Sequence, residues 1–171
     1  MWFGAVGFAL AGVAGVCALG GVAFAEAVSL PERKAGLWEL TTTMDEGKGP
    51  VDRTLTMCVD ADMERNTVIA SLIEHKQACT KYDIKRDGDK TVVDMSCKFE
   101  TRNVEGRTEM SGDFQSALLV KIESTTSGDH RGQSVAVKRT ITQTGKYLGE
   151  SCGDLTGGEA MSSDGTRVMV Q

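Results

Sequence analysis

Cysteine is the residue type whose number and spacing say most about chemistry in this sequence. Five cysteines are present, at positions 17, 58, 79, 97 and 152. Cys17 lies in an uncharged segment at the start, and the remaining even number predicts disulfides if the protein is exported. The four are separated by 21, 18 and 55 residues without a Cys-x-x-Cys pair, whereas zinc sites and redox-active dithiols use closely spaced ligands. We therefore expect two disulfides and no metal site.

The residues between Cys79 and Cys97 favour one of the three possible pairings. Two strand-like runs flank the turn at residues 87–89, Asp-Gly-Asp, and Asp-Gly is typical of tight hairpin turns. A hairpin folded about this turn places Cys79 opposite Cys97, which leaves Cys58 to pair with Cys152. The alternative pairing is Cys58 with Cys79 and Cys97 with Cys152.

The apolar pattern of the same hairpin conflicts with this simple register. Opposite the face of Val93 and Met95 it places Asp83 and Lys81, because Tyr82 would point to the other side. A shift of one residue aligns the apolar faces but separates the cysteines. A β-bulge would reconcile the two requirements.

The acidic run at residues 60–64 resembles a calcium loop only in part. Asp60, Asp62 and Glu64 alternate, but such a loop also needs glycine at its sixth position and glutamate at its twelfth. Those positions hold Arg65 and Ser71. We expect instead the acidic start of a helix, with Asp60 as its cap.

The histidines do not indicate a catalytic site. His75 and His130 lie far apart, and the sequence has no Gly-x-Ser-x-Gly, phosphate-loop or dinucleotide motif. We expect both to be solvated and the protein not to be an enzyme, with no catalytic residue and no cofactor.

Trp38 and several methionines are the residues that could bind an apolar ligand. Aromatic side chains chiefly bury apolar area, so a core position for Trp38 is the first expectation. The alternative is an apolar cavity in which flexible methionines adapt to a ligand. The candidate residues for that cavity, or for the core, are Trp38, Met57 and Met95.

The charge pattern indicates where the protein is located. Residues 1–25 have no ionisable side chain and end in Ala23-Phe24-Ala25, which fits a signal-peptide cleavage site. No basic residue precedes the apolar run, so an atypical signal, a start codon set too far downstream and an uncleaved anchor are alternatives. No later run is long enough to span a membrane. The net charge of −5 argues against nucleic-acid binding. We expect a periplasmic protein without a stable membrane span after cleavage.

Strands must position most of these residues. Alternation predicts strands at 36–44 and 53–59, a helix at about 60–75, and further strands at 80–86, 90–99, 106–116, 118–126 and 133–144. In the last strand Val135, Val137 and Ile141 should be buried and Lys138 solvated. The expected fold is mainly β: a curved antiparallel meander sheet or partly closed barrel of about seven strands with one inserted helix. Residues 26–35 should form a linker, 36–152 the disulfide-stabilised domain and 153–171 a flexible tail.

The opening and closing segments of this domain carry a family resemblance. Residues 36–42, Gly-Leu-Trp-Glu-Leu-Thr-Thr, resemble the opening motif of the exported bacterial family called domain of unknown function 3617. The order of the four cysteines and the closing segment 145–152 are also similar, although Lys146 stands where the family commonly has arginine and one extra residue precedes Cys152. The resemblance implies a periplasmic, four-cysteine, mostly β domain and assigns no activity.

Two functions are therefore expected in order. The first is a non-enzymatic, envelope-associated domain that binds a protein partner, and the second is a carrier of a small apolar ligand on the concave face of the sheet. A recessed apolar surface would favour the carrier.

Overall fold

A computed structural model describes residues 28–130 and 132–170, so residues 1–25 with the expected signal segment and Cys17 lie outside the described part. Strands make up most of it. The elements in chain order are β1 (Gly36–Asp45), β2 (Val51–Val59), α1 (Ala61–Ala78), β3 (Cys79–Asp87), β4 (Lys90–Phe99), β5 (Arg102–Gly112), β6 (Ala117–His130), β7 (Gln133–Gly149), β8 (Glu159–Ser162) and β9 (Arg167–Met169).

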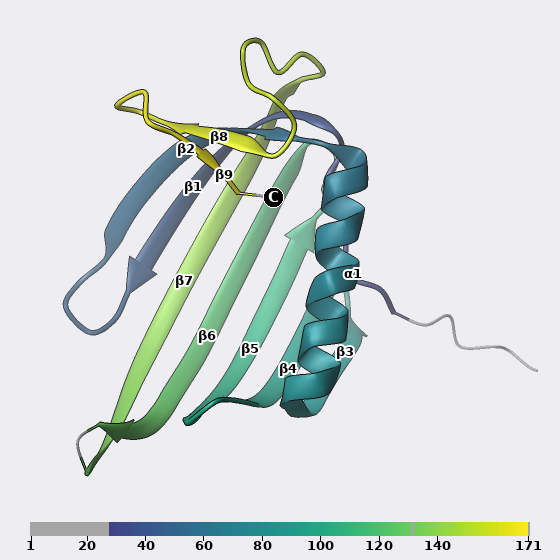
Figure 1. Ribbon diagram of the computed structural model, residues 1–171. Helices are drawn as coiled ribbons and strands as arrows, with labels where there is room; N and C mark the ends of the chain where they lie inside the picture. The colour runs from purple at the N-terminus through teal and green to yellow at the C-terminus, as the bar shows by residue number, and fades with distance from the viewer. Residues whose placement is uncertain (1–27, 131, 171) are drawn as a thin grey trace, which may run out of the picture.

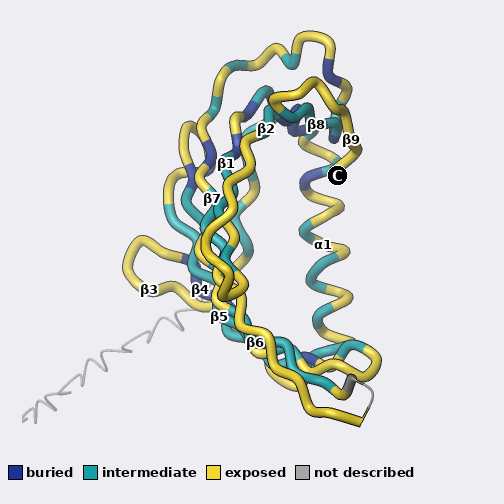
Figure 2. The backbone as a smooth tube through the Cα atoms, turned by 90° about the vertical axis from the view of Figure 1, so that its left-hand side faces the viewer, coloured by how far each residue is buried: buried dark blue, intermediate teal, exposed yellow. Residues whose placement is uncertain are grey.

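All described strands join one antiparallel sheet in the order β3-β4-β5-β6-β7-β1-β2-β8-β9. The sheet curves, and α1 runs across its concave side (Figures 1 and 2). Within the described residues β3 and β9 remain unpaired edges, so the sheet does not close. The prediction of a mainly β, curved antiparallel sheet with one inserted helix is confirmed.

The two faces of the sheet differ because side chains alternate along each strand. Trp38 on β1 lies opposite Met57 on β2 and Tyr147 on β7, and these side chains all face α1. We call the side facing α1 the concave face. The register also places on it the apolar side chains of Leu40, Leu55, Val59, Ile84, Val93, Met95, Val104, Met110, Leu118, Val120, Ile122, Val135, Val137 and Ile141.

At one end of the concave face these side chains form a packed core. The core cluster consists of Trp38, Leu40, Met57, Val59, Phe114, Leu118 and Ala160. Gly145 fits this packing, because a Cβ built there would lie 2.7 Å from Cγ of Leu118. A side chain at position 145 would therefore displace a core leucine.

Helix α1 is fixed at both ends. At its start, Oδ1 of Asp60 accepts hydrogen bonds from the backbone N–H groups of Asp62 and Met63, so the predicted cap is confirmed. Glu64 in the first turn accepts from the Arg33 guanidinium, with Nη2 to Oε2 at 2.6 Å. At its end the helix passes directly into β3 at Cys79, which is bonded to Cys97.

The β3–β4 hairpin satisfies both sequence requirements at once. Cys79 lies opposite Cys97, and a register shift between Cys79 and Lys81 then brings Tyr82 opposite Met95. The bulge therefore aligns the apolar faces without separating the cysteines. The second disulfide joins Cys58 to Cys152.

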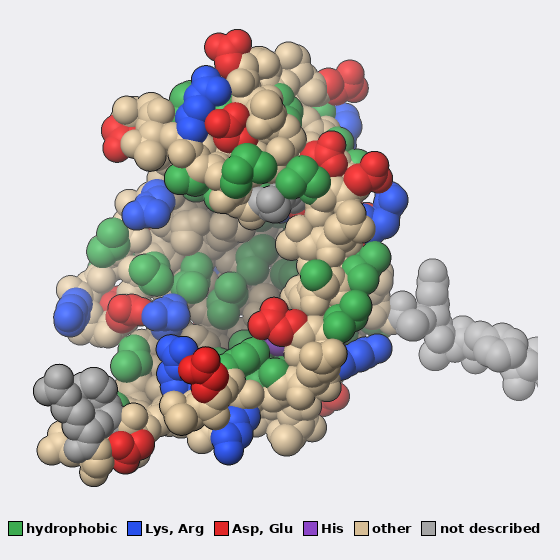
Figure 3. Space-filling view, in the orientation of Figure 1, with side chains coloured by type: hydrophobic (Ala, Val, Ile, Leu, Met, Phe, Trp, Pro, Cys, Tyr) green, Lys and Arg blue, Asp and Glu red, His purple; other side chains and the backbone are tan. Residues whose placement is uncertain are grey.

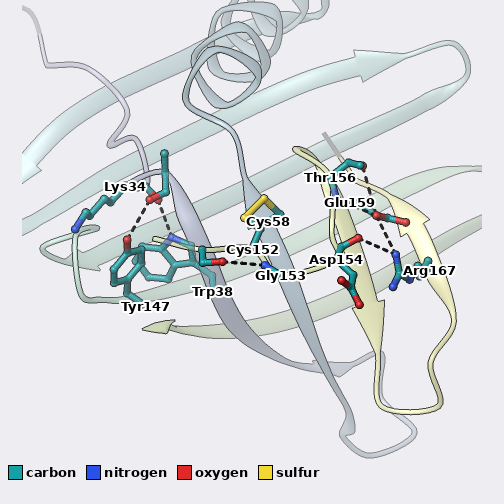
Figure 4. Close-up of a disulfide and its surroundings, with 12 residues drawn as sticks. Lys34, Trp38, Cys58, Tyr147, Cys152, Gly153, Asp154, Thr156, Glu159 and Arg167 are labelled. Atoms are coloured by element: carbon teal, nitrogen blue, oxygen red, sulfur yellow. Dashed lines mark hydrogen bonds and ion pairs between the residues drawn. A yellow bond between two sulfur atoms is a disulfide. The ribbon is translucent and has the colours of Figure 1, made fainter. Parts of the chain in front are cut away.

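The opening and closing segments of the domain meet in space (Figure 4). Tyr147 packs edge-on against Trp38, with ring centroids 5.5 Å apart, and its hydroxyl donates to the carbonyl of Ala35. Gly36 adopts φ +127°, and a Cβ there would lie 2.4 Å from the carbonyl oxygen of Gly149. Only glycine allows β1 to start this close to the end of β7. The segment at 28–35, expected as a linker, is therefore held against the domain, and Lys34 also donates its N–H to the carbonyl of Phe114.

Three strand boundaries differ from the sequence prediction. Residues 103–106 were expected to connect two strands, but they lie within β5, which starts at Arg102. Strand β6 continues to His130 and β7 to Gly149. The error comes from glycine: Gly106 lies on the concave face beneath Met95, whose Cε would be 2.8 Å from a Cβ, so packing rather than a turn requires it.

The expectation of a flexible tail at 153–171 is also wrong for the described residues. Residues 159–162 form β8, which pairs with β2, and 167–169 form β9. Ala160 is fully buried in the core cluster. The segment is ordered because it follows Cys152, whose bond to Cys58 holds the chain beside β2.

The β5–β6 connection depends on one aspartate. Asp113 accepts hydrogen bonds from the backbone N–H groups of Ser116, Ala117 and Gln115 and from the Ser116 hydroxyl. The Ser116 and Ala117 amides, first among these contacts, lower the pKa of Asp113 well below its usual range. The bonds hold Phe114 at φ 56°, with its ring in the core cluster.

We expect Asp113→Asn to destabilise the protein in a pH-dependent way. A carboxylate whose pKa is lowered on folding stabilises the native state above its unfolded pKa, about 4, and this contribution disappears as the pH falls through the native pKa. Urea unfolding should show a deficit at pH 6 that shrinks below pH 4. Asp52→Asn, at an exposed aspartate that makes no side-chain hydrogen bond in the described structure, is the control. A deficit independent of pH would contradict this role.

Candidate functional site

The concave face changes from packed core to open surface along its length. Trp38 is fully buried, whereas Val137 and Val135 on β7 are 42% and 45% exposed. Between them, Val120, Ile122 and Ile141 are half-buried. Apolar side chains line a hollow between α1 and the strands in the space-filling view (Figure 3). The face is thus continuous in chemistry but only partly covered by protein.

We define the distal patch as the apolar residues of this open end: Val104, Ile122, Val135, Val137 and Ile141. In the sheet register Ile122 lies opposite Ile141, and Thr126 lies between Val104 and Val137. The side chains therefore form one contiguous surface across β5, β6 and β7.

Helix α1 covers the concave face from a distance. It packs against β3 and β4, and the side view shows it standing away from β6 and β7 (Figure 2). Its C-terminal end contacts the sheet through His75, whose ring stacks on Tyr82 with centroids 4.6 Å apart. Burial raises the pKa of the Tyr82 phenol. The helix therefore leaves the distal patch uncovered.

The residues singled out from the sequence divide between the core and the concave face. Trp38 and Met57 belong to the core cluster and are buried, so they close one end of the face rather than line an open cavity. Met95 is half-buried on the concave face above Gly106. The expected ligand residues thus lie on the correct face, but two of the three are far from its open part.

The remaining candidates have structural contacts. Asp60 caps α1, Glu64 binds Arg33, and Asp62 forms an ion pair with Arg65. His75 packs on Tyr82, and the side chain of His130 lies outside the described part of the structure. Among the described residues, three or more potential metal ligands do not gather anywhere.

The opposite, convex face carries charge instead. Lys85, Asp94, Arg107, Glu109 and Lys90 form a chain of ion pairs across β3, β4 and β5. Lys85 and Arg107 lower the pKa of Asp94. Every charge in this chain is paired with an opposite one, so the face has the character of a solvated surface.

Sequence analysis missed the residues that make the concave face open. It predicted burial for Val135 and Val137, but β7 extends past the end of β1, and α1 does not reach this part. It also did not single out Arg102, the first residue of β5, which faces the same side as Val104. The signal that could have found the patch is the apolar alternation of β7, which continues almost to the hairpin turn.

Comparison with known families places this fold. The model of a family described as a protein of unknown function (DUF3617) matches residues 33–152. The chain belongs to this family. The DUF3617 match starts at Arg33, which binds α1, and ends at Cys152, so β8 and β9 lie beyond the matched region. Comparisons with the curated proteins and with the solved structures found no similar chain.

Two further findings describe the setting of this DUF3617 chain. Its two disulfides are typical of proteins from oxidising compartments. Within residues 28–130 and 132–170, the structure contains no helix that is both long and apolar enough to cross a membrane.

Proposed function

We propose that this protein is a non-enzymatic, exported binding protein that holds a hydrocarbon chain on the concave face of its sheet. The observation that carries the proposal is the continuity of the apolar face, from the buried core cluster to exposed valines on β7. Leaving large apolar side chains in water costs free energy, roughly 1.5–3 kcal/mol for a valine- or leucine-sized group. A bound apolar chain would recover that free energy.

The shape of the surface favours a small ligand over a protein partner. The distal patch lies on the inside of the curve and is flanked by α1, so a flat protein surface would meet the helix first. A flexible chain can lie along the strands instead. From Arg102 to Met110 the concave face of β5 extends about 26 Å at the usual rise per residue.

The chemistry of the binding surface suits hydrocarbon. Its half-buried and exposed side chains on β6 and β7 are mostly branched aliphatics, with Thr126 and Gln143 as polar members. Apolar contact is non-directional, so such a surface would select ligands by length and apolarity rather than by a fixed hydrogen-bond pattern. The disulfides and the uncharged N-terminal segment support a location in the periplasm.

Binding of the uncharged fluorescent probe N-phenyl-1-naphthylamine tests the proposal. The disulfide-bonded protein should show saturable binding, with an increase in probe fluorescence. Val137→Asp should weaken it at least tenfold, because a charge on the distal patch must be desolvated by an apolar ligand. Ala136→Asp is the matched control: it is the neighbouring residue of β7, is exposed, and faces the convex side.

The two variants separate the proposal from a general effect of charge on the hairpin. Equal loss of binding in both variants, or no saturable binding by the unmodified protein, would overturn it. Extraction and mass spectrometry of protein purified from the periplasm provide a second readout, in which a reproducible apolar compound is expected.

A further inference from the structure

The open end of the concave face contains one unpaired cationic side chain, Arg102. It is the first residue of β5 and lies opposite Gly128 on β6. A Cβ built at Gly128 would lie 3.3 Å from Cγ of Arg102. The arginine stem therefore lies across β6 at a position where only glycine leaves room for it.

Arg102 forms part of the wall of a small pocket. Its other lining residues are Thr126, Gly128, Asp129, Val135 and Val137, and its volume is about 190 Å³. Pockets for whole drug-sized ligands are typically 300 Å³ or more. This pocket is thus of a size for one end of a ligand, with the distal patch continuing from it.

The charge of Arg102 is not neutralised within the described residues. Its guanidinium makes no hydrogen bond or ion pair there, unlike Arg33, Arg107 and Arg139, each of which binds a glutamate. Asp129 also lines the pocket, but its Oδ1 accepts from the N–H of Gly132, 2.8 Å away, within the β6–β7 turn. Arg102 therefore keeps all its donors available beside two exposed valines.

We propose that Arg102 binds the carboxylate of a long-chain carboxylic acid whose hydrocarbon chain lies along the distal patch. This inference rests on the proposed function and names its ligand class. A guanidinium presents two parallel donors that match the two oxygens of a carboxylate. One arginine, with an aspartate nearby, matches a single negative charge better than a phosphate dianion. The apolar residues beyond the pocket are on the same sheet face, so head and chain can bind together.

The test compares three ligands that share one chain and differ at the head: dodecanoate, dodecanol and dodecyl phosphate. Each displaces N-phenyl-1-naphthylamine from the disulfide-bonded protein at pH 8, where the carboxylic acid is ionised. Dodecanoate should bind about tenfold more tightly than dodecanol, the usual contribution of a charge-assisted hydrogen-bond pair. Arg102→Gln should reduce this preference to about twofold or less while leaving dodecanol affinity unchanged.

A matched control is Arg53→Gln. Arg53 faces the same side of the sheet, on β2, is exposed, and has no acidic partner within the described residues. It lies away from the pocket of Arg102, so its replacement should preserve the preference for dodecanoate. Equal loss in both variants would indicate a general electrostatic effect and overturn the assignment.

The remaining outcomes are distinct. Equal displacement by dodecanoate and dodecanol would overturn the carboxylate site while the proposed function stands. Tighter binding of dodecyl phosphate than of dodecanoate, lost in Arg102→Gln, would replace the carboxylate with a phosphate head. Absence of probe binding by the unmodified protein would overturn the proposed function and this inference together.

Discussion

Replacing both Cys58 and Cys152 with alanine should lower the free energy of unfolding by about 4–5 kcal/mol. A disulfide stabilises mainly by restricting the unfolded chain, and this effect grows with the length of the closed loop. Cys58 and Cys152 are 94 residues apart, whereas Cys79 and Cys97 are 18 apart. The corresponding loss for Cys79→Ala with Cys97→Ala is about 3 kcal/mol.

Urea unfolding followed by fluorescence of Trp38 measures both losses. Peptide mapping without reductant should show in each double variant that the other disulfide is intact. A larger loss for the shorter loop would contradict the loop-length argument. It would show instead that the contact of α1 with β4, fixed through Cys79, dominates the stability of the domain.

Trp38→Ala should cost about 3–5 kcal/mol, the range for removing a large aromatic side chain from a packed core. Trp38 is fully buried, packs on Tyr147, and donates from Nε1 to the carbonyl of Lys34 at 2.8 Å. Its removal would leave a cavity at the closed end of the concave face. It would also release the segment before β1 that binds α1 through Arg33.

Trp38→Phe separates packing from hydrogen bonding. Phenylalanine keeps an aromatic ring against Tyr147 but leaves the Lys34 carbonyl without its donor, which costs about 1–3 kcal/mol. Thermal and urea unfolding should therefore rank the alanine variant as the less stable of the two. An alanine variant within about 1 kcal/mol of the unmodified protein would show that the ring is not a core anchor.

Local patterns in the sequence were sufficient for the fold class and for the conflict at the β3–β4 hairpin. Alternation showed that Tyr82 belongs opposite Met95, and the turn showed that Cys79 belongs opposite Cys97; the bulge satisfies both. Such constraints act over a few residues, so they are visible without knowledge of the tertiary structure.

Features set by distant contacts were not predictable in the same way. Gly106 was interpreted as part of a turn because the sequence does not show that Met95 packs above it. The C-terminal residues seemed too polar and glycine-rich to fold, yet Ala160 is buried because the Cys58–Cys152 bond brings the segment to β2. In both cases the deciding neighbour is at least 11 residues away in the chain.

The candidate site shows the same division. The sequence indicated an apolar face with Trp38 and methionines, but it did not show where the covering elements stop. Exposure of Val135 and Val137 follows from the different lengths of β1 and β7 and from the position of α1, which are properties of the assembled sheet.

The length of β7 also bears on self-association. Strand β1 pairs with β7 only from Thr140 to Gly149, so residues 133–139 form a free sheet edge within the described chain. Exposed edges invite the strands of other molecules, most of all where they carry valines. Lys138 and Arg139 lie within this edge, and a second copy added in antiparallel register would meet them with its own positive charges. The edge beside the open apolar face is thereby protected against fibre-like stacking while the face itself stays accessible.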